Sequence, residues 1–330
     1  GKKRAEEVLA GDICAVAGLE PVDIGDTIAC PDQPIALPIV AIDEPTMSMT
    51  FNVNNGPFAG QDGKYVTSLQ LRDRLDKELQ TNVALRVASG RTADEFVVSG
   101  RGLMHLGILL ENMRREGYEV CVGKPQVIVR MIDGVRQEPI ERLVIECPVD
   151  CQNAVMSLIG TRRSEMLKMD SKSGASNYVH MEFMIPSRGL FGLNARVLTA
   201  TQGRAIMHHT FEQYEPMRGS IPDRQAGVLI ASETGTVTAY ALDALYERGF
   251  FFVRPGDRVY EGQVVGEHCK DNDVVVNATR AKQMSNMRTS SKDDAARIRP
   301  ARIMSLEAHL EYVQHDELVE ICPSSIRLRK

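Results

Sequence analysis

Residues 94–122, DEFVVSGRGLMHLGILLENMRREGYEVCV, decide the fold of this chain. The apolar run FVV predicts a strand, and YEVCV predicts a second one. Between them, apolar residues at helical spacing predict a helix with one buried face. These residues are Leu106, Leu109, Leu110 and Met113. A strand, a helix and a strand in this order form the second half of a split β-α-β unit.

The residues before this stretch supply the first half of the unit. From residue 47 to residue 53, apolar side chains alternate with Thr, Ser and Asn, which is typical of a half-buried strand. A charged helix with Leu71, Leu75 and Leu79 on one face follows, and NVALRVA predicts another strand. The order β-α-β-β-α-β predicts a ferredoxin-like domain, which we place at residues 37–128.

A second ferredoxin-like domain is predicted at residues 129–216. The stretches IERLVIECPV, EMLKMD, NYVHMEFMI and AIMHHTFEQYE predict strands, while CQNAVMSLIGTRR and RGLFGLNARVLTAT predict helices. In both domains the second helix is expected to begin at Arg-Gly-Leu, at residues 101–103 and 188–190. The same supersecondary unit therefore occurs twice.

The flanking segments predict β structure. Residues 8–30 place Gly and Asp between β-branched residues, which predicts short strands with tight turns. Residues 217–330, including AGVLIASETGTVTAYAL, are strand-rich and predict a separate, mainly β domain. A short helix is expected there at Leu306, Leu310 and Val313. The expected fold class is therefore α+β.

Composition narrows the possible functions. The 330 residues carry a net charge of −5, so any basic function must be local. Trp is absent and aromatic residues are few, which argues against large base-stacking platforms. The seven cysteines form no CxxC pair, so we expect reduced thiols in a cytoplasmic protein. Neither export nor a membrane span is indicated. The opening GKKRAEEVLAGDICAV suggests the middle of a domain, so a fragment is expected.

The glycine-rich stretch NNGPFAGQDGKYVTS, residues 54–68, resembles a phosphate-binding loop at first sight. Such a loop needs Gly, four spacers, Gly-Lys, and then Ser or Thr. Counting back from Gly63, the first glycine position holds Phe58, and Tyr65 follows Lys64. We therefore expect a β-to-α turn that uses glycine flexibility. No other nucleotide-binding motif occurs, so no catalytic residue is assigned.

The other reactive side chains have structural explanations. His208 and His209 are neighbours on a predicted strand, so they point to opposite faces and cannot share a metal ion. His105 begins a helix beside core leucines, and we expect it to be packed. Cys151 opens a helix, whose dipole could lower its pKa. No partnered base can be assigned to Cys151, and a thiol-dependent hydrolase stays as an alternative.

The strongest local charge lies in NATRAKQMSNMRTSSKDDAARIRPAR, residues 277–302. Seven basic residues and two acidic ones give this segment a net charge of +5. Arg and Lys suit phosphate contacts, and the dense Ser, Thr and Asn suit hydrogen bonds to phosphate and sugar. Composition alone leaves RNA binding and a solvated loop equally open. The candidate RNA-binding residues are Arg280, Lys282, Asn286, Arg288, Ser290, Ser291, Lys292, Arg297 and Arg299.

Several stretches resemble a known group of translation factors. SGRGLMHLGILLENMRREGYEV is similar to the third domain of elongation factor G, and IPSRGLFGLNARVLTATQGRAIMHHTFEQYEP to its fifth domain. AGDI and GDTI resemble the end of a β-barrel second domain, which we assign to residues 1–36. The inserted fourth domain is missing, because GVRQEPIERLVIE leads directly on. This order and the tail from residue 286 to residue 330 resemble the TypA/BipA family over essentially the whole chain.

The resemblance implies part of a ribosome-associated GTPase that acts in stress response, growth at low temperature and large-subunit assembly. GTP and Mg²⁺ would bind in a GTPase domain outside these residues, so this part would have no cofactor and no catalysis of its own. The basic loop at residues 277–296 would contact the acceptor arm of A-site tRNA and 23S rRNA on the 70S ribosome. A cytoplasmic monomer without membrane contact is expected. A ribosome-protection factor of the same superfamily is another alternative, although such factors retain the inserted domain.

Overall fold

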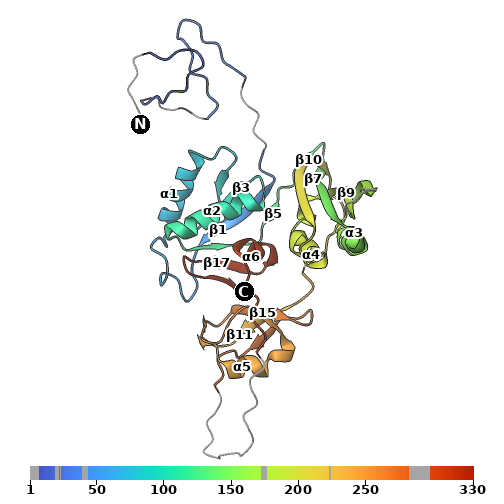
Figure 1. Ribbon diagram of the computed structural model, residues 1–330. Coiled ribbons are helices and arrows are strands. Elements are labelled where there is room, and N and C mark those ends of the chain that lie inside the picture. The colour runs from blue at the N-terminus through green and yellow to red at the C-terminus, as the bar shows by residue number, and fades with distance from the viewer. Residues whose placement is uncertain are drawn as a thin grey trace, which may run out of the picture.

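The computed structural model describes residues 7–18, 22, 24–38, 44–171, 177–222, 224–281 and 298–330. The fold is α+β, as the sequence predicts, and contains three units. We call residues 44–128 the first unit, residues 129–216 the second unit and residues 226–330 the C-terminal unit (Figure 1).

The first unit has the predicted ferredoxin-like fold. Its elements are β1 (Met47–Val53), α1 (Ser68–Leu79), β2 (Arg86–Ser89), β3 (Glu95–Gly100), α2 (Leu103–Glu116) and β4 (Val120–Val122), with the short β5 (Gln126–Val127) beside β1. The sheet is antiparallel in the order β4-β1-β3-β2. Thr67 caps α1 with a reciprocal hydrogen-bonded box to Gln70, and Gly117 ends α2 in the left-handed conformation at φ 97°.

The second unit repeats this topology. Its elements are β6 (Arg130–Ile132), β7 (Val135–Pro148), η1 (Val149–Cys151), α3 (Gln152–Gly160), β8 (Glu165–Ser171), β9 (Tyr178–Pro186), η2 (Ser187–Gly189), α4 (Leu193–Ala200) and β10 (Ile206–Pro216). The main strands have the order β10-β7-β9-β8, and β6 pairs with β7. Its hydrophobic core includes Leu143, Val155 and Val197. The helix expected from Arg188 begins at Leu193 instead, because residues 187–189 form a 3₁₀ turn.

The C-terminal unit is mainly β. It contains β11 (Val228–Ala231), β12 (Gly235–Thr236), α5 (Ala239–Ala244), η3 (Tyr246–Arg248), β13 (Gly249–Phe251), β14 (Arg258–Val259), β15 (Gln263–His268), β16 (Val274–Val276), α6 (Leu306–Tyr312), β17 (Leu318–Ile321) and β18 (Ile326–Arg329). The prediction that AGVLIASETGTVTAYAL forms strands is wrong for its last residues. Residues 239–244 are helical there because the Thr238 hydroxyl accepts a hydrogen bond from the Ala241 N–H and caps the helix.

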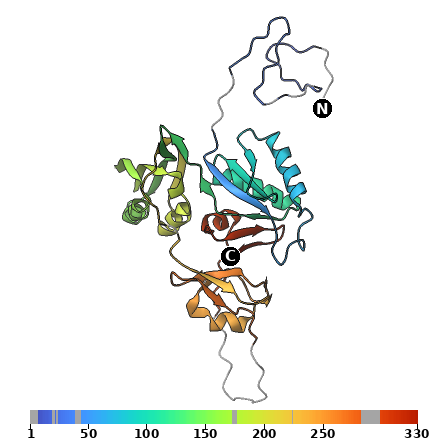
Figure 2. The ribbon, with the colours of Figure 1, turned by 180° about the vertical axis from the view of Figure 1, so that it is seen from behind.

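The C-terminal unit shares a sheet with the first unit. Strand β17 lies antiparallel to β4, with Val319 opposite Val122 and Ile321 opposite Val120. The resulting path runs β16-β11-β15-β18-β17-β4-β1-β3-β2. Figures 1 and 2 show the C-terminal strands beside the first unit, with α6 close to α2. The predicted boundary at residue 216 separates the second unit from the C-terminal unit, and the shared sheet joins the C-terminal unit to the first unit.

One hydrophobic core lies beneath this joint. Leu106 and Leu110 of α2 belong to the same buried cluster as Leu306 and Leu310 of α6, together with Ile321 of β17. Burying these side chains stabilises both units at once, at about 25 cal/mol for each Å² of apolar surface removed from water. The hairpin of β17 and β18, together with α6, is therefore a structural part of the first unit's core.

The strands expected at residues 8–30 are not present in the described part of that segment. It contains turns and one isolated bridge between Cys30 and Gln33, and its apolar side chains are exposed. A strand is stabilised by a neighbouring strand and a buried face, and the described residues provide neither here. Among the described helices, none is long and apolar enough to cross a lipid bilayer.

The shared sheet predicts that a change in β17 weakens β4. Ile321 is 1% exposed, so Ile321→Ala should lower the free energy of unfolding by roughly 2–5 kcal/mol. It should also speed hydrogen exchange at the β4 amides, measured by mass spectrometry. The control is Ile303→Ala, at a residue 70% exposed, which should change little. Unchanged exchange at β4 in the Ile321 variant would show that the two units do not depend on each other.

Candidate functional site

The glycine loop at residues 54–68 binds an internal carboxylate. The Glu119 side chain accepts hydrogen bonds from the backbone N–H groups of Gly60 at 2.8 Å, Asp62 at 3.1 Å and Gly63 at 2.6 Å. The Asn54 side chain donates a fourth at 3.2 Å. Inward-facing N–H groups of this kind favour an anion. Here the anion is the protein's own Glu119, which confirms that the loop is a structural turn.

Glu119 is stabilised in its charged form despite its burial. It is 2% exposed, and burial by itself raises the pKa of a carboxyl. The backbone hydrogen bonds from the glycine loop outweigh this effect and bring the pKa of Glu119 below its usual value. The carboxylate thus accepts the hydrogen bonds of three backbone N–H groups of the loop.

The outer side of the glycine loop contacts the C-terminal unit. The Phe58 ring packs edge-on against Tyr260 at a centroid distance of 5.2 Å, and the Arg327 guanidinium lies over the Phe58 ring at 5.2 Å. The Asp62 carboxylate accepts hydrogen bonds from the Ser324 N–H at 2.9 Å and hydroxyl at 2.5 Å. The position that a phosphate loop reserves for its first glycine is therefore an aromatic anchor between two units.

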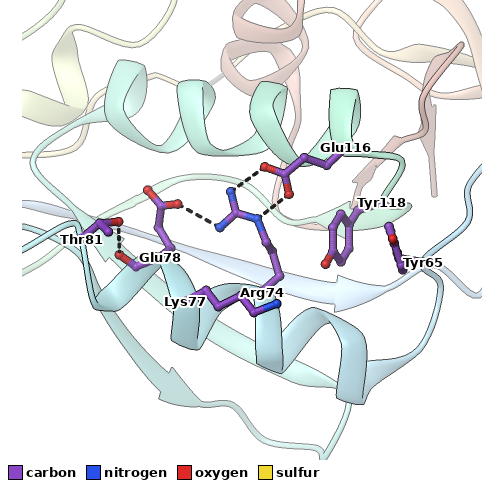
Figure 3. A pocket seen from close by; sticks show the side chains of 7 residues that line it. All are labelled: Tyr65, Arg74, Lys77, Glu78, Thr81, Glu116 and Tyr118. Atoms are coloured by element: carbon purple, nitrogen blue, oxygen red, sulfur yellow. Dashed lines mark hydrogen bonds and ion pairs between the residues drawn. The ribbon is translucent and has the colours of Figure 1, made fainter. Parts of the chain in front are cut away.

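A polar hollow of about 480 Å³ lies between α1 and α2 (Figure 3). Its central cation is Arg74, which forms ion pairs with Glu116 at 2.6 Å and Glu78 at 2.9 Å. The hydrogen bond to Glu116 raises the pKa of Arg74. The rings of Tyr65 and Tyr118 stack on each other at 4.6 Å. Because these carboxylates already neutralise the arginine, the hollow is poorly suited to a phosphate.

Of the candidate reactive histidines, His105 and His209 form structural side-chain contacts, whereas His208 is exposed. His105 accepts a hydrogen bond from the Arg101 N–H at 3.3 Å and contacts the Asn82 amide at 2.8 Å, and burial lowers its pKa. His208 and His209 lie at successive positions on β10, as predicted. His209 contacts the Glu141 carboxylate at 2.5 Å, and this hydrogen bond raises the pKa of His209.

No reactive centre forms around Cys151 in the described structure. The thiol is buried, and an Arg204 guanidinium nitrogen donates to its Sγ at 3.3 Å. That guanidinium also pairs with Asp150 at 3.0 Å. No histidine hydrogen-bonds to Cys151 among the residues placed here, so the base that a thiol hydrolase needs is not beside it. In the same residues no group of three His, Cys, Asp or Glu side chains could hold a metal ion.

Two of the predicted RNA-binding residues lie in the described part of the basic segment. Arg280 is exposed, and its carbonyl accepts a hydrogen bond from the Thr238 hydroxyl at 2.5 Å, next to the start of α5. The Arg299 guanidinium lies over the Tyr246 ring at 4.2 Å and the Phe250 ring at 5.1 Å. The other seven lie outside the described residues. They are Lys282, Asn286, Arg288, Ser290, Ser291, Lys292 and Arg297.

Both described ends of the basic segment are attached to neighbouring elements of the C-terminal unit. Arg280 is tied to the first turn of α5, and Arg299 packs on η3 and β13, which follow α5 directly in the chain. Within the described ranges, neither Arg280 nor Arg299 forms an ion pair with an acidic side chain. No carboxylate of the described residues therefore neutralises these two positive charges.

Comparisons with known proteins agree with this architecture. The family model described as "Elongation factor G C-terminus" matches residues 135–225, and that for the "TypA/BipA C-terminal domain" matches residues 226–330. "Large ribosomal subunit assembly factor BipA" of Bacillus subtilis (strain 168) is 49% identical over 333 residues, covering 100% of this chain and 54% of that protein. The Synechocystis and Salmonella typhimurium proteins of the same name are 48% and 46% identical, and this chain covers 54% and 53% of them.

The matches and the fold of this chain point to the same group of proteins. Its ferredoxin-like units, the second of which matches an elongation factor G domain, give it the architecture of an elongation factor G-type translation factor. The chain belongs to the TypA/BipA family, as predicted. It spans about half the length of the curated relatives that it matches.

The Glu119 site predicts a pH-dependent stability. Glu119→Gln should lower the free energy of unfolding by about 1–3 kcal/mol at pH 7, because a charged acceptor of four hydrogen bonds is lost. The folded-state pKa is lowered, so the carboxylate stabilises the fold fully above the usual pKa of about 4.3 and loses this effect as pH falls through the folded value. The difference between variant and parent should therefore narrow below about pH 4.

Urea unfolding at pH 7 and below about pH 4 measures the difference in the free energy of unfolding between the Glu119 variant and the parent protein. Glu233→Gln, at an exposed glutamate of the C-terminal unit, is the matched control and should match the parent protein throughout. Equal stabilities of the parent and the Glu119 variant at pH 7 would contradict the assignment of Glu119 as the anion of the glycine loop.

Proposed function

We propose that this chain is the ribosome- and RNA-docking part of a TypA/BipA-type translational GTPase that acts in assembly of the large ribosomal subunit. The observation that carries the proposal is the near-half identity, over the whole chain, to proteins named large ribosomal subunit assembly factors. The net charge of +5 on residues 277–302, and the attachment of the exposed Arg280 and the half-buried Arg299 to the C-terminal unit, support a role in RNA contact.

The proposed partners are the 70S ribosome, its 23S rRNA and the acceptor arm of A-site tRNA. Cationic side chains release counterions when they neutralise RNA phosphates, so this binding should weaken steeply with salt. A segment fixed at both ends loses less conformational freedom on binding than a free tail would. The C-terminal unit thus positions the basic segment, and the Arg and Lys side chains of the segment attract the RNA phosphates.

The proposal assigns catalysis to another part of the protein. In this proposal, GTP and Mg²⁺ bind to a GTPase domain outside these residues, and these residues catalyse no reaction themselves. Within residues 44–171, β4 leads to β7 through the short β5 and β6, and no further domain intervenes. A ribosome-protection factor with an inserted domain at this point is therefore disfavoured. The proposal also includes action as a cytoplasmic monomer in stress response.

Neutralising the basic segment should abolish most of the ribosome affinity. We expect the variant with Arg280, Lys282, Arg288 and Lys292 changed to Ala to bind at least about tenfold more weakly in pelleting assays. The slope of log affinity against log salt should fall by about 3, since up to four phosphate contacts are lost.

The matched control removes the same charge elsewhere. Arg72, Lys77, Arg86 and Arg91 are exposed on the first unit, and changing them to Ala should leave most of the affinity and the salt slope intact. Unchanged binding by the basic-segment variant, or an equal loss in the control, would contradict the proposed role of the segment.

A further inference from the structure

An aromatic ring is held outward beside the basic segment. Strand β13 alternates in burial, so Gly249 and Phe251 face inward and Phe250 faces solvent, with 53% of the residue exposed. The described structure places an arginine from the basic segment, Arg299, over this ring. Phe250 therefore presents a large apolar surface at the place where the positive charge is anchored.

The strand that carries Phe250 is firmly packed. A Cβ at Gly249 would come within 1.9 Å of the Glu267 carbonyl oxygen. At this position β13 and β15 therefore pack too closely for any residue other than glycine. The Arg302 N–H also donates to the Phe251 carbonyl at 2.8 Å, which attaches the end of the basic segment to β13. The position of the ring is thus fixed by backbone contacts on both sides of the strand.

The Arg299 guanidinium contacts two aromatic rings. It lies over Tyr246 at 4.2 Å and over Phe250 at 5.1 Å, within the range of cation–π attraction. Nucleic-acid bases stack on aromatic rings and on guanidinium planes alike. Because more than half of Phe250 is exposed, the ring retains free surface after Arg299 has covered part of it.

The charges around Phe250 favour an anionic partner. Arg248 is exposed next to it, and Arg299 has no acidic partner among the described residues. Of the acids nearby, Glu267 is paired with Arg302 at 3.5 Å, and Glu247 is exposed. Among the described residues, Arg248 and Arg299 thus set two guanidinium groups against the exposed Glu247 beside this apolar ring, which favours an anionic partner. An RNA base with its phosphate fits such a surface better than an apolar peptide does.

We propose that Phe250 and Arg299 form a stacking platform for one unpaired RNA base, next to the phosphate contacts of the basic segment. This inference rests on the proposed function and deepens it, because it names the state of the RNA at this site. A base inside a duplex is covered by its neighbours, so the platform selects a looped-out or terminal nucleotide. A single ring is a small platform, which agrees with the low aromatic content of the chain.

Phe250→Trp tests the stacking directly. The chain contains no Trp, so this variant carries a sole indole reporter. We expect saturable quenching of its fluorescence by a single-stranded oligoadenylate, and little quenching by a blunt RNA duplex of the same length or by inorganic tripolyphosphate. Phe211→Trp, at a residue 43% exposed on β10 of the second unit, is the matched control and should not be quenched.

Phe250→Ala measures the contribution of the ring. Its affinity for the oligoadenylate should fall roughly 5- to 150-fold, the range for loss of one stacked base, with an unchanged salt slope. Circular dichroism and the thermal midpoint should match the parent chain, because the side chain is exposed.

The outcomes separate this inference from the proposed function. Equal quenching by duplex RNA or tripolyphosphate would overturn the stacking platform, and so would full affinity in Phe250→Ala. If the four-charge variant loses ribosome binding while Phe250→Trp is not quenched, the proposed function stands and the platform is refuted. If the four-charge variant binds ribosomes normally, the proposed function fails, whatever Phe250 does.

Discussion

The pairing of β17 with β4 joins the first unit and the C-terminal unit into one sheet. Its three residue pairs continue the sheet of the first unit into the C-terminal unit, and the buried leucines of α2 and α6 fill a common core beneath it. The two units cannot turn relative to each other without breaking backbone hydrogen bonds and exposing apolar surface. The ends of the basic segment therefore have a defined position relative to the first ferredoxin-like sheet.

The glycine loop forms a second contact between the first unit and the C-terminal unit. On its inner side Glu119 satisfies the loop N–H groups, and on its outer side Phe58 packs on Tyr260. A Cβ at Gly56 would come within 1.9 Å of a Glu320 carboxylate oxygen, so a larger residue there would have to displace this buried side chain. Burial raises the pKa of Glu320. The guanidinium nitrogens of Arg327 and Arg329, each 3.9 Å from a Glu320 carboxylate oxygen, offset part of this rise. A loop that resembles a nucleotide site is thus used to hold two units together.

Periodicity predicted the parts of the fold that depend on local burial. Alternation at Met47, Met49 and Phe51 and the helical spacing of Leu106, Leu109 and Leu110 predicted the first ferredoxin-like unit, and the apolar patterns within residues 140–215 predicted the second. The β17–β4 contact was not predictable, since two short strands about 200 residues apart carry no signal of their mutual register. Glu119 was missed for the same reason, because its partners are distant in sequence. At residues 8–30 the strand pattern was present, but the described chain supplies no neighbouring strand.

The basic residues were found from charge alone, and the structure adds where Arg280 and Arg299 are attached. In the proposed function, this attachment brings the segment to one defined place on ribosomal RNA. Hydroxyl-radical footprinting of 23S rRNA tests it most directly, comparing the parent chain with one whose residues 282–297 have every Arg and Lys changed to Gln. We predict one discrete set of protected nucleotides that disappears in the variant. Identical protection by both chains, or no discrete protection by either, would contradict the account.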